Sequence, residues 1–200
     1  AALKDFTVSG TVVGVDVAGI VGITGNNQTT TIINVVSNVD LTGKQGINDK
    51  NEVRGKVAGI VCCPKGNVTI KNCTNNGNIF AIDGPAGGIV AYIDVDITIE
   101  NCTNNGYVYV NYGGQGDFGQ AGGLIGVGNA KCTVTSCTNN GDVYSSTTKE
   151  NYPLYIGEII GKLNKNGTAV ITKCTYNKEN GKYAVGNQKD SASSDKIKIN

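Results

Sequence analysis

Apolar and polar residues alternate in short runs along the chain, and glycine, asparagine and other turn-forming residues separate the runs. The alternation is clearest in residues 68–71, 97–100 and 132–135. A period of two residues is typical of a half-buried β-strand. No segment sustains the apolar spacing of three and four residues over the length that an amphipathic helix needs. The pattern therefore predicts an all-β chain built from short strands.

Two short motifs recur in phase with each other. The first reads Cys-Thr-Asn-Asn-Gly and starts at Cys73, Cys102 and Cys137, with a looser copy at Cys174. The second is a pair of mostly small residues followed by two apolar residues, and its five copies start at Ala18, Ala58, Gly87, Gly122 and Gly157. The offset between the motifs is 14 residues from Gly59 to Cys73, from Gly88 to Cys102 and from Gly123 to Cys137. Such periodicity indicates one structural unit repeated five times.

Each unit contains three short apolar runs, and a single unit cannot bury its apolar face alone. The sequence therefore predicts a right-handed parallel β-helix, or β-solenoid, of about five three-stranded coils. The right hand follows from the general rule for parallel crossover connections. We expect residues 1–16 to form a strand or cap of a preceding coil, 17–186 to form the repeats, and 187–200 to be a polar tail or closing strand.

Equivalent positions of stacked coils fall into columns. One inner column is expected to hold the four motif cysteines, with Val36 at its foot and Ile33 also facing inward. Two further inner columns consist of Ile70, Ile99, Val134 and Ile171, and of Ile79, Val108 and Val143. The Asn-Asn-Gly segments are expected to stack at a corner, where asparagines hydrogen-bond along the column and the glycine adopts a positive φ.

The cysteines are interpreted as small core residues with free thiols, because parallel stacked side chains give poor disulfide geometry. Cys132 is assigned to the core because it occupies the repeat position of Val68 and Ile97. The adjacent Cys62 and Cys63 leave two alternatives open. Either one faces inward while the other packs at a turn, which is favoured, or the two form a strained vicinal disulfide.

The second motif resembles a known repeat. Segments such as Gly123-Leu124-Ile125-Gly126 are similar to the GLUG repeat, although Cys63, Ala91 and Glu158 depart from its pattern. The resemblance covers about residues 17–186. The GLUG repeat occurs in bacterial surface and secreted proteins, among them large adhesin-like proteins and accessory regions of immunoglobulin A-cleaving metallopeptidases. It brings no catalytic residues with it.

Charge and composition exclude several function classes. A net charge of +1 with Arg54 as the only arginine gives no basic patch for nucleic acid. The chain has no histidine, so imidazole catalysis and histidine-ligated metal are ruled out. No apolar run reaches the length of about 20 residues that a membrane span needs, and no cofactor is expected. The chain starts at Ala1 and has no methionine, so we interpret it as a processed or trimmed fragment with flanking domains.

The alternative is a carbohydrate-active enzyme, since parallel β-helices include polysaccharide lyases and glycoside hydrolases. Asp94 and Asp96 are the best carboxylate pair for general acid and base work on a glycosidic bond. The same residues and Asp117 are also candidate calcium ligands, although one or two carboxylates do not complete a calcium site. Acidic residues in a turn more often serve solubility, so no catalytic or metal residue is assigned.

Aromatic residues form the tentative ligand-binding site. Alternation places Phe80, Tyr109 and Tyr144 in one outward column, and Tyr107 and Tyr112 are close in sequence. Exposed rings in a row can stack on sugars or anchor a protein partner, and the alternative is that they stack on one another and stiffen the surface. Longer connections at 42–56, 111–120 and 145–155 are expected along one edge. A second outward column holds Thr69, Thr98 and Thr133 and is interrupted by Val170.

Together these observations predict a protein that is not an enzyme. By its resemblance to GLUG-repeat proteins, we expect a bacterial cell-surface or secreted module that acts as a stalk, spacer or adhesin. Its expected partners are a glycan or a host or extracellular protein, with neither nucleic acid nor a membrane among them. The competing hypothesis is a carbohydrate-active β-helix enzyme that uses Asp94 and Asp96.

Overall fold

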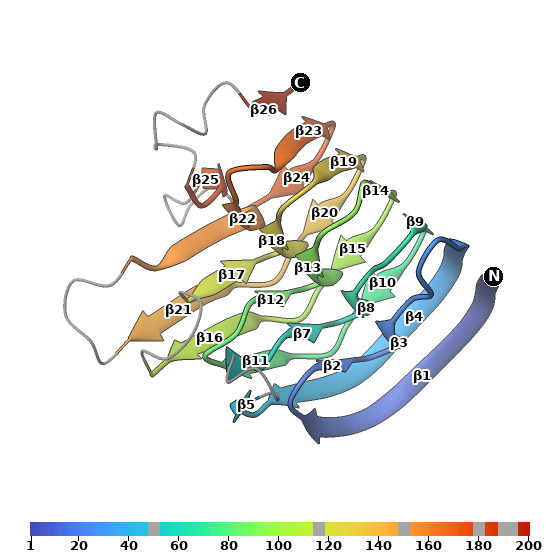
Figure 1. Cartoon of the computed structure of the whole chain (residues 1–200). Coiled ribbons are helices and arrows are strands. Elements are labelled where there is room, and N and C mark those ends of the chain that lie inside the picture. Colours follow the sequence, from blue (N-terminus) through green and yellow to red (C-terminus); the bar gives the residue numbers. More distant parts are fainter. Residues whose placement is uncertain (48–52, 114–118, 148–152, 178–182, 188–195) are drawn as a thin grey trace.

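Parallel β-strands stacked in curled sheets make up the structure, a computed structural model that describes residues 1–47, 53–113, 119–147, 153–177, 183–187 and 196–200. Within these ranges the chain forms strands, turns and bends and contains no helix. The strands follow one another from β1 at one end of the stack to β23 and β26 at the other (Figure 1). This arrangement agrees with the predicted β-solenoid.

The larger sheet contains three rows of stacked strands. The first row consists of β9 (Asn67–Lys71), β14 (Ile97–Glu100), β19 (Lys131–Thr135), β23 (Thr168–Thr172) and β26 (Ile197–Ile199). The second row consists of β10 (Thr74–Asn75), β15 (Thr103–Asn104), β20 (Thr138–Asn139) and β24 (Thr175–Tyr176). The third row consists of β11 (Ile79–Ile82), β16 (Val108–Tyr112) and β21 (Val143–Thr147). A single long strand, β4 (Thr29–Gly43), pairs with all three rows, and β1 (Ala2–Gly14) runs beside β4.

The second sheet holds two rows. One consists of β2 (Val17–Ala18), β7 (Val57–Ala58), β12 (Ala86–Gly87) and β17 (Gln120–Gly122), and the other of β3 (Val21–Ile23), β8 (Val61–Cys63), β13 (Val90–Ile93) and β18 (Ile125–Gly128). The strand β22 (Tyr155–Leu163) spans both rows, and β25 (Tyr183–Val185) pairs with it. A small antiparallel pair, β5 (Gly46–Ile47) with β6 (Val53–Arg54), lies between β4 and β7 in the chain.

The strand register confirms the predicted columns. Ile70, Ile99, Val134 and Ile171 lie opposite one another, as do Ile79, Val108 and Val143, and all of these side chains are buried. Cys132 is also completely buried, and the predicted final strand is β26. All seven cysteines are free thiols. Buried apolar residues from both sheets form the core between them.

The first coil corrects one prediction. Thr74 pairs with Val36, so the residue beneath Cys73 is Val35, which is fully buried, whereas Ile33 and Val36 are only partly buried. The physical reason is Asn34, whose φ of 56° interrupts the alternation between Ile32 and Val35. A strand pattern read straight through that residue assigns the following side chains to the wrong face.

The repeat also contains more strands than predicted. Between Val57 and Ile82 the chain forms five short strands, β7 to β11, instead of three. A corner residue with a positive φ separates β9 from β10 and recurs in every copy, at Asn34, Asn72, Asn101, Ser136 and Lys173. The left-handed conformation bends the chain at this residue. It separates two strands in the later copies, whereas β4 continues through Asn34.

The glycine of the Asn-Asn-Gly segment has a different role from the one predicted. Gly77, Gly106 and Gly141 are not among the residues with positive φ. A Cβ atom on Gly106 would lie 1.9 Å from the carbonyl oxygen of Gly77, and one on Gly141 would lie 1.9 Å from that of Gly106. These glycines are therefore required by the close approach of neighbouring coils.

Candidate functional site

The outward aromatic column forms as the sequence predicts. Phe80 pairs with Tyr109, and Tyr109 pairs with Tyr144, on the adjacent strands β11, β16 and β21. The ring centroids of Phe80 and Tyr109 are 5.3 Å apart at an interplanar angle of 48°. Those of Tyr109 and Tyr144 are 4.6 Å apart and stacked at 25°. Both geometries fall within the range of favourable aromatic contacts, so the rings stabilise one another as well as the surface.

The exposed part of the column is at its Tyr144 end. Phe80 and Tyr109 are half-buried, whereas the exposed fractions are 41% for Tyr144 and 38% for Tyr107. The rings of Tyr107 and Tyr144 lie 6.2 Å apart, and we call these two residues the tyrosine pair. The structure thus brings four of the five predicted site residues together on one outer surface.

Tyr112 does not belong to this surface. Its side chain is only 1% exposed, because alternation along β16 turns Val108, Val110 and Tyr112 inward while Tyr109 faces outward. The prediction that Tyr112 contributes to ligand binding is therefore wrong. Tyr112 is instead one of the largest buried side chains of the protein.

The tyrosine pair offers hydroxyl groups as well as ring surface. The pKa of Tyr144 is raised above its usual value, mainly by partial burial. The electrostatic effects of Tyr107, Tyr109 and Asp142 raise it further. Tyr144 therefore remains a neutral phenol that can both donate and accept a hydrogen bond. Tyr109 shares a hydrogen bond of 2.6 Å with Ser146, which fixes the central ring of the column.

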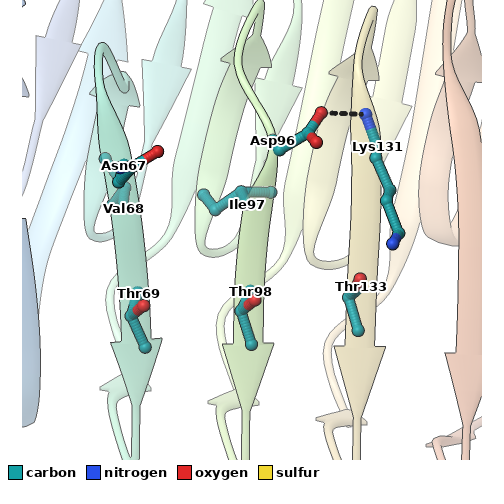
Figure 2. A pocket seen from close by; sticks show the side chains of 8 residues that line it. All are labelled: Asn67, Val68, Thr69, Asp96, Ile97, Thr98, Lys131 and Thr133. Atoms are coloured by element: carbon teal, nitrogen blue, oxygen red, sulfur yellow. Dashed lines mark hydrogen bonds between the residues drawn. The ribbon is translucent and has the colours of Figure 1, made fainter. Parts of the chain in front are cut away.

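A second feature is a depression of about 240 Å³ on the outer face of β9, β14 and β19. The threonine column Thr69, Thr98 and Thr133 crosses it, and Asp96 accepts a hydrogen bond of 3.1 Å from the backbone nitrogen of Lys131 (Figure 2). The register confirms the threonine column, extends it to Thr31 and ends it at Val170. Most of the lining residues are polar, and the charged Asp96 and Lys131 lie together at one end of the depression (Figure 2).

Asp94 and Asp96 each link neighbouring coils. Asp94 forms an ion pair of 3.3 Å with Lys65 and accepts a hydrogen bond of 3.0 Å from Asn129. Asp96 accepts a hydrogen bond from the backbone nitrogen of Lys131, at the start of β19. Both carboxylates therefore connect neighbouring coils through these contacts. Asp117, the third candidate calcium ligand, lies outside the described residues, as do parts of the three long connections.

The predicted hydrogen bonds between stacked asparagines are confirmed, but sequence reasoning missed that one of the asparagine columns is buried. The side-chain amides of Asn75, Asn104 and Asn139 donate upward to the next residue in turn, at 2.8 Å, 2.9 Å and, from Asn139 to the buried Glu158, 2.9 Å. Each amide also donates to the carbonyl oxygen two residues ahead. The signal was present in the sequence, because only one of two adjacent asparagines on a strand can face outward.

Two absences hold for the residues that the structure describes. No group of three or more acidic or cysteine side chains is close enough to hold a metal ion. No helix in these ranges has the length and apolarity of a membrane span.

Comparison with known proteins adds no identification. No family model matches the chain, and neither the curated proteins nor the solved structures contain a significant match.

Proposed function

We propose that the chain is a non-catalytic binding module of a bacterial surface or secreted protein, built as a right-handed β-solenoid of about five coils. Its ligand would be a glycan or an extracellular protein. The single observation that carries the proposal is the tyrosine pair, which remains exposed at the end of an otherwise self-stacked aromatic column. The resemblance to GLUG repeats supports the bacterial and extracellular setting.

The geometry favours the tyrosine pair over the rest of the column as the contact point. One ring face of Tyr109 stacks on Tyr144, and the Tyr109 hydroxyl shares a hydrogen bond with Ser146. Tyr107 and Tyr144 present ring area and polar tips together, a combination enriched at protein and carbohydrate interfaces. A second candidate function, hydrolysis or lysis of a polysaccharide, gains no support from Asp94 and Asp96, since both are engaged between coils.

A glycan and extracellular-matrix array tests the proposal. We expect the native chain to bind one class of ligand and the double variant Tyr107→Ala/Tyr144→Ala to lose at least tenfold in affinity. Tyr183→Ala is the matched control, because Tyr183 is 39% exposed but lies on β25 in the second sheet. Unchanged binding by the double variant would contradict the site. If the native chain binds no ligand on the array, the result would contradict ligand binding and favour a role as a spacer.

A further inference from the structure

Two adjacent thiols meet at the end of β8. The Sγ atoms of Cys62 and Cys63 are 3.5 Å apart. Neighbouring residues of a regular strand point to opposite faces, so this approach requires the strand to end here. β8 does end at Cys63, and the following Pro64 restricts the backbone of Cys63 to extended conformations. The chain therefore holds the two thiols together before any bond forms between them.

The two thiols differ in their access to solvent. Cys62 is 1% exposed, packs with Ala58 and Ala91, and contacts the carbonyl oxygen of Lys56 at 3.6 Å. Cys63 is only partly buried. This arrangement agrees with the favoured sequence interpretation of one inward and one turn cysteine.

The neighbouring coil leaves space on one side of the pair. The register of β3 with β8 places Gly22 beside Cys62 and Ile23 beside Cys63. Gly22 is exposed, and no heavy atom lies within 4 Å of the position that its Cβ would occupy. This space adjoins the pair in the strand register, and Cys63, the less buried of the two thiols, is the one that a small reagent is expected to reach.

The other five cysteines have different surroundings. Cys73, Cys102, Cys132 and Cys137 are completely buried, and Cys174 is partly buried. Cys73, Cys102 and Cys137 donate to carbonyl oxygens of their own or the neighbouring coil, for example Cys102 to Glu100 at 3.2 Å. Cys73, Cys102, Cys137 and Cys174 belong to successive coils and lie within hydrogen-bonding range of one another along their ladder. Their parallel stacked side chains give poor disulfide geometry. Selective chemistry at Cys62 and Cys63 is therefore expected from their place at the end of a strand and from the access to Cys63.

We propose that Cys62 and Cys63 form a redox-active dithiol that exchanges with small disulfides and closes to a vicinal disulfide. The Cys63 thiolate attacks one sulfur of the small disulfide, forms a mixed disulfide and releases one small thiolate. The Cys62 sulfur then attacks the Cys63 sulfur and releases the second small thiolate. Two protein thiols are oxidised, one small disulfide is reduced to two thiols, and the protons pass to the released thiolates.

The electrostatic surroundings assign these roles. The hydrogen bond from Cys62 lowers the pKa of Cys63, burial raises it, and Lys56 lowers it further, with a net decrease. The pKa of Cys62 is raised by the same hydrogen bond and by burial. The thiolate is the nucleophile in exchange, so the more accessible Cys63 attacks first and Cys62 resolves the mixed disulfide. This inference does not depend on the proposed ligand binding.

Mass spectrometry of the native chain tests the proposal. After incubation with oxidised glutathione, we expect the protein to lose the mass of two hydrogens and to retain five of its seven thiols. Peptide mapping should place the new bond between Cys62 and Cys63, and dithiothreitol should restore all seven thiols. Retention of all seven thiols under conditions that oxidise a reference dithiol would overturn the proposal, as would a bond mapped to any other cysteines.

Variants and a second probe provide controls. Phenylarsine oxide, which crosslinks two close thiols, should bind the native chain with one-to-one stoichiometry and should not bind Cys63→Ser. Cys132→Val is the matched control, because Val68 and Ile97 occupy the same column, and it should keep both reactions. In Cys63→Ser, glutathione should leave the remaining cysteines free. Phenylarsine oxide binding to Cys63→Ser equal to that of the native chain would also contradict the assignment.

Discussion

At the residue scale, the two recurring motifs stay in phase because their residues touch. A Cβ on Gly88 would lie 2.4 Å from the side chain of Asn104 and 2.1 Å from the carbonyl oxygen of Gly123. Gly59 and Gly123 face Asn75 and Asn139 in the same way. The buried asparagine of one motif therefore requires the glycine of the other, and this contact accounts for the constant spacing of 14 residues in these three copies.

Gly88→Ala is expected to destabilise the fold by about 3 kcal/mol or more, because the added methyl meets rigid backbone as well as a ladder asparagine. Gly22→Ala is the matched control, since its Cβ would meet nothing within 4 Å. Chemical denaturation of both variants measures the difference. Equal stability of the two would contradict the close contact between the motifs.

The lower end of the asparagine ladder leaves two polar atoms without partners among the described residues. These are the Oγ of Ser37 and the Oδ1 of Asn75, which are buried and belong to paired residues. Ser37→Asn would place a side-chain amide below Asn75, in the same relation as Asn104 has to Asn139. It should donate to Asn75 and to the carbonyl oxygen of Val39, and raise the free energy of unfolding by about 1 kcal/mol.

Thermal denaturation checks this prediction, with Ser37→Ala as the control. The alanine variant removes one orphaned hydroxyl but leaves Asn75 Oδ1 without a donor, so it should gain less. A melting temperature for Ser37→Asn at or below that of Ser37→Ala would show that the ladder does not extend downward.

At the element scale, the corner between the first and second rows depends on residues that accept a left-handed backbone. Asn34, Asn72 and Asn101 do so readily and also hydrogen-bond along their column, at 3.1 Å and 3.3 Å. In the last copy the corner residue is Lys173, with a φ of 54°. A lysine has no side-chain means of stabilising this conformation.

Lys173→Asn is therefore expected to stabilise the fold by about 0.5–1 kcal/mol. The reverse exchange, Asn72→Lys, should destabilise it, because it loses both the favoured conformation and two side-chain hydrogen bonds. Urea denaturation of the two variants gives the opposite shifts. A loss of stability in Lys173→Asn would contradict this account of the corner.

The same corner marks the limit of sequence reasoning about elements. The columns were predictable because the repeats align the same residue types, and the aromatic column follows from that alignment. The division of each repeat into five strands and the shift of the inward residue from Val36 to Val35 could not be predicted. Both depend on a single residue with a left-handed backbone, which the alternation of apolar and polar residues does not reveal. The burial of Tyr112 could have been inferred, since it is an even number of residues from the inward Val108.

At the scale of the whole molecule, the buried thiols couple stability to alkaline pH. Burial, and then Asp96, raises the pKa of Cys132 to about 12. An unfolded chain ionises this thiol near pH 8.5, so the folded state loses about 1 kcal/mol per pH unit between these values. The contribution is complete below the unfolded pKa and is lost as the pH rises toward the folded one.

Cys132→Val should flatten the decline of stability above about pH 9, because valine cannot ionise and suits a column that already contains Val68 and Ile97. The decline should be reduced without disappearing, since the pKa values of Cys62, Cys102 and Cys174 are raised as well. Denaturation curves of both proteins across the alkaline range make the comparison. Identical pH profiles would contradict the role of Cys132.

Successive coils are equivalent, and shared columns hold their strands in register. Cys73 and Cys102 are 29 residues apart, so deleting residues 74–102 joins Cys73 to Thr103 and removes one whole coil. The deletion keeps the inward and outward faces of all remaining strands and retains the tyrosine pair. Deleting residues 74–101 removes one residue fewer and shifts every following strand to the wrong face.

Cooperative thermal unfolding, followed by circular dichroism, is the most direct measurement. We expect a β-rich protein with a single sharp transition for the deletion of residues 74–102. We expect no cooperative transition for the deletion of residues 74–101. Cooperative folding of both variants, or of neither, would contradict the equivalence of the coils.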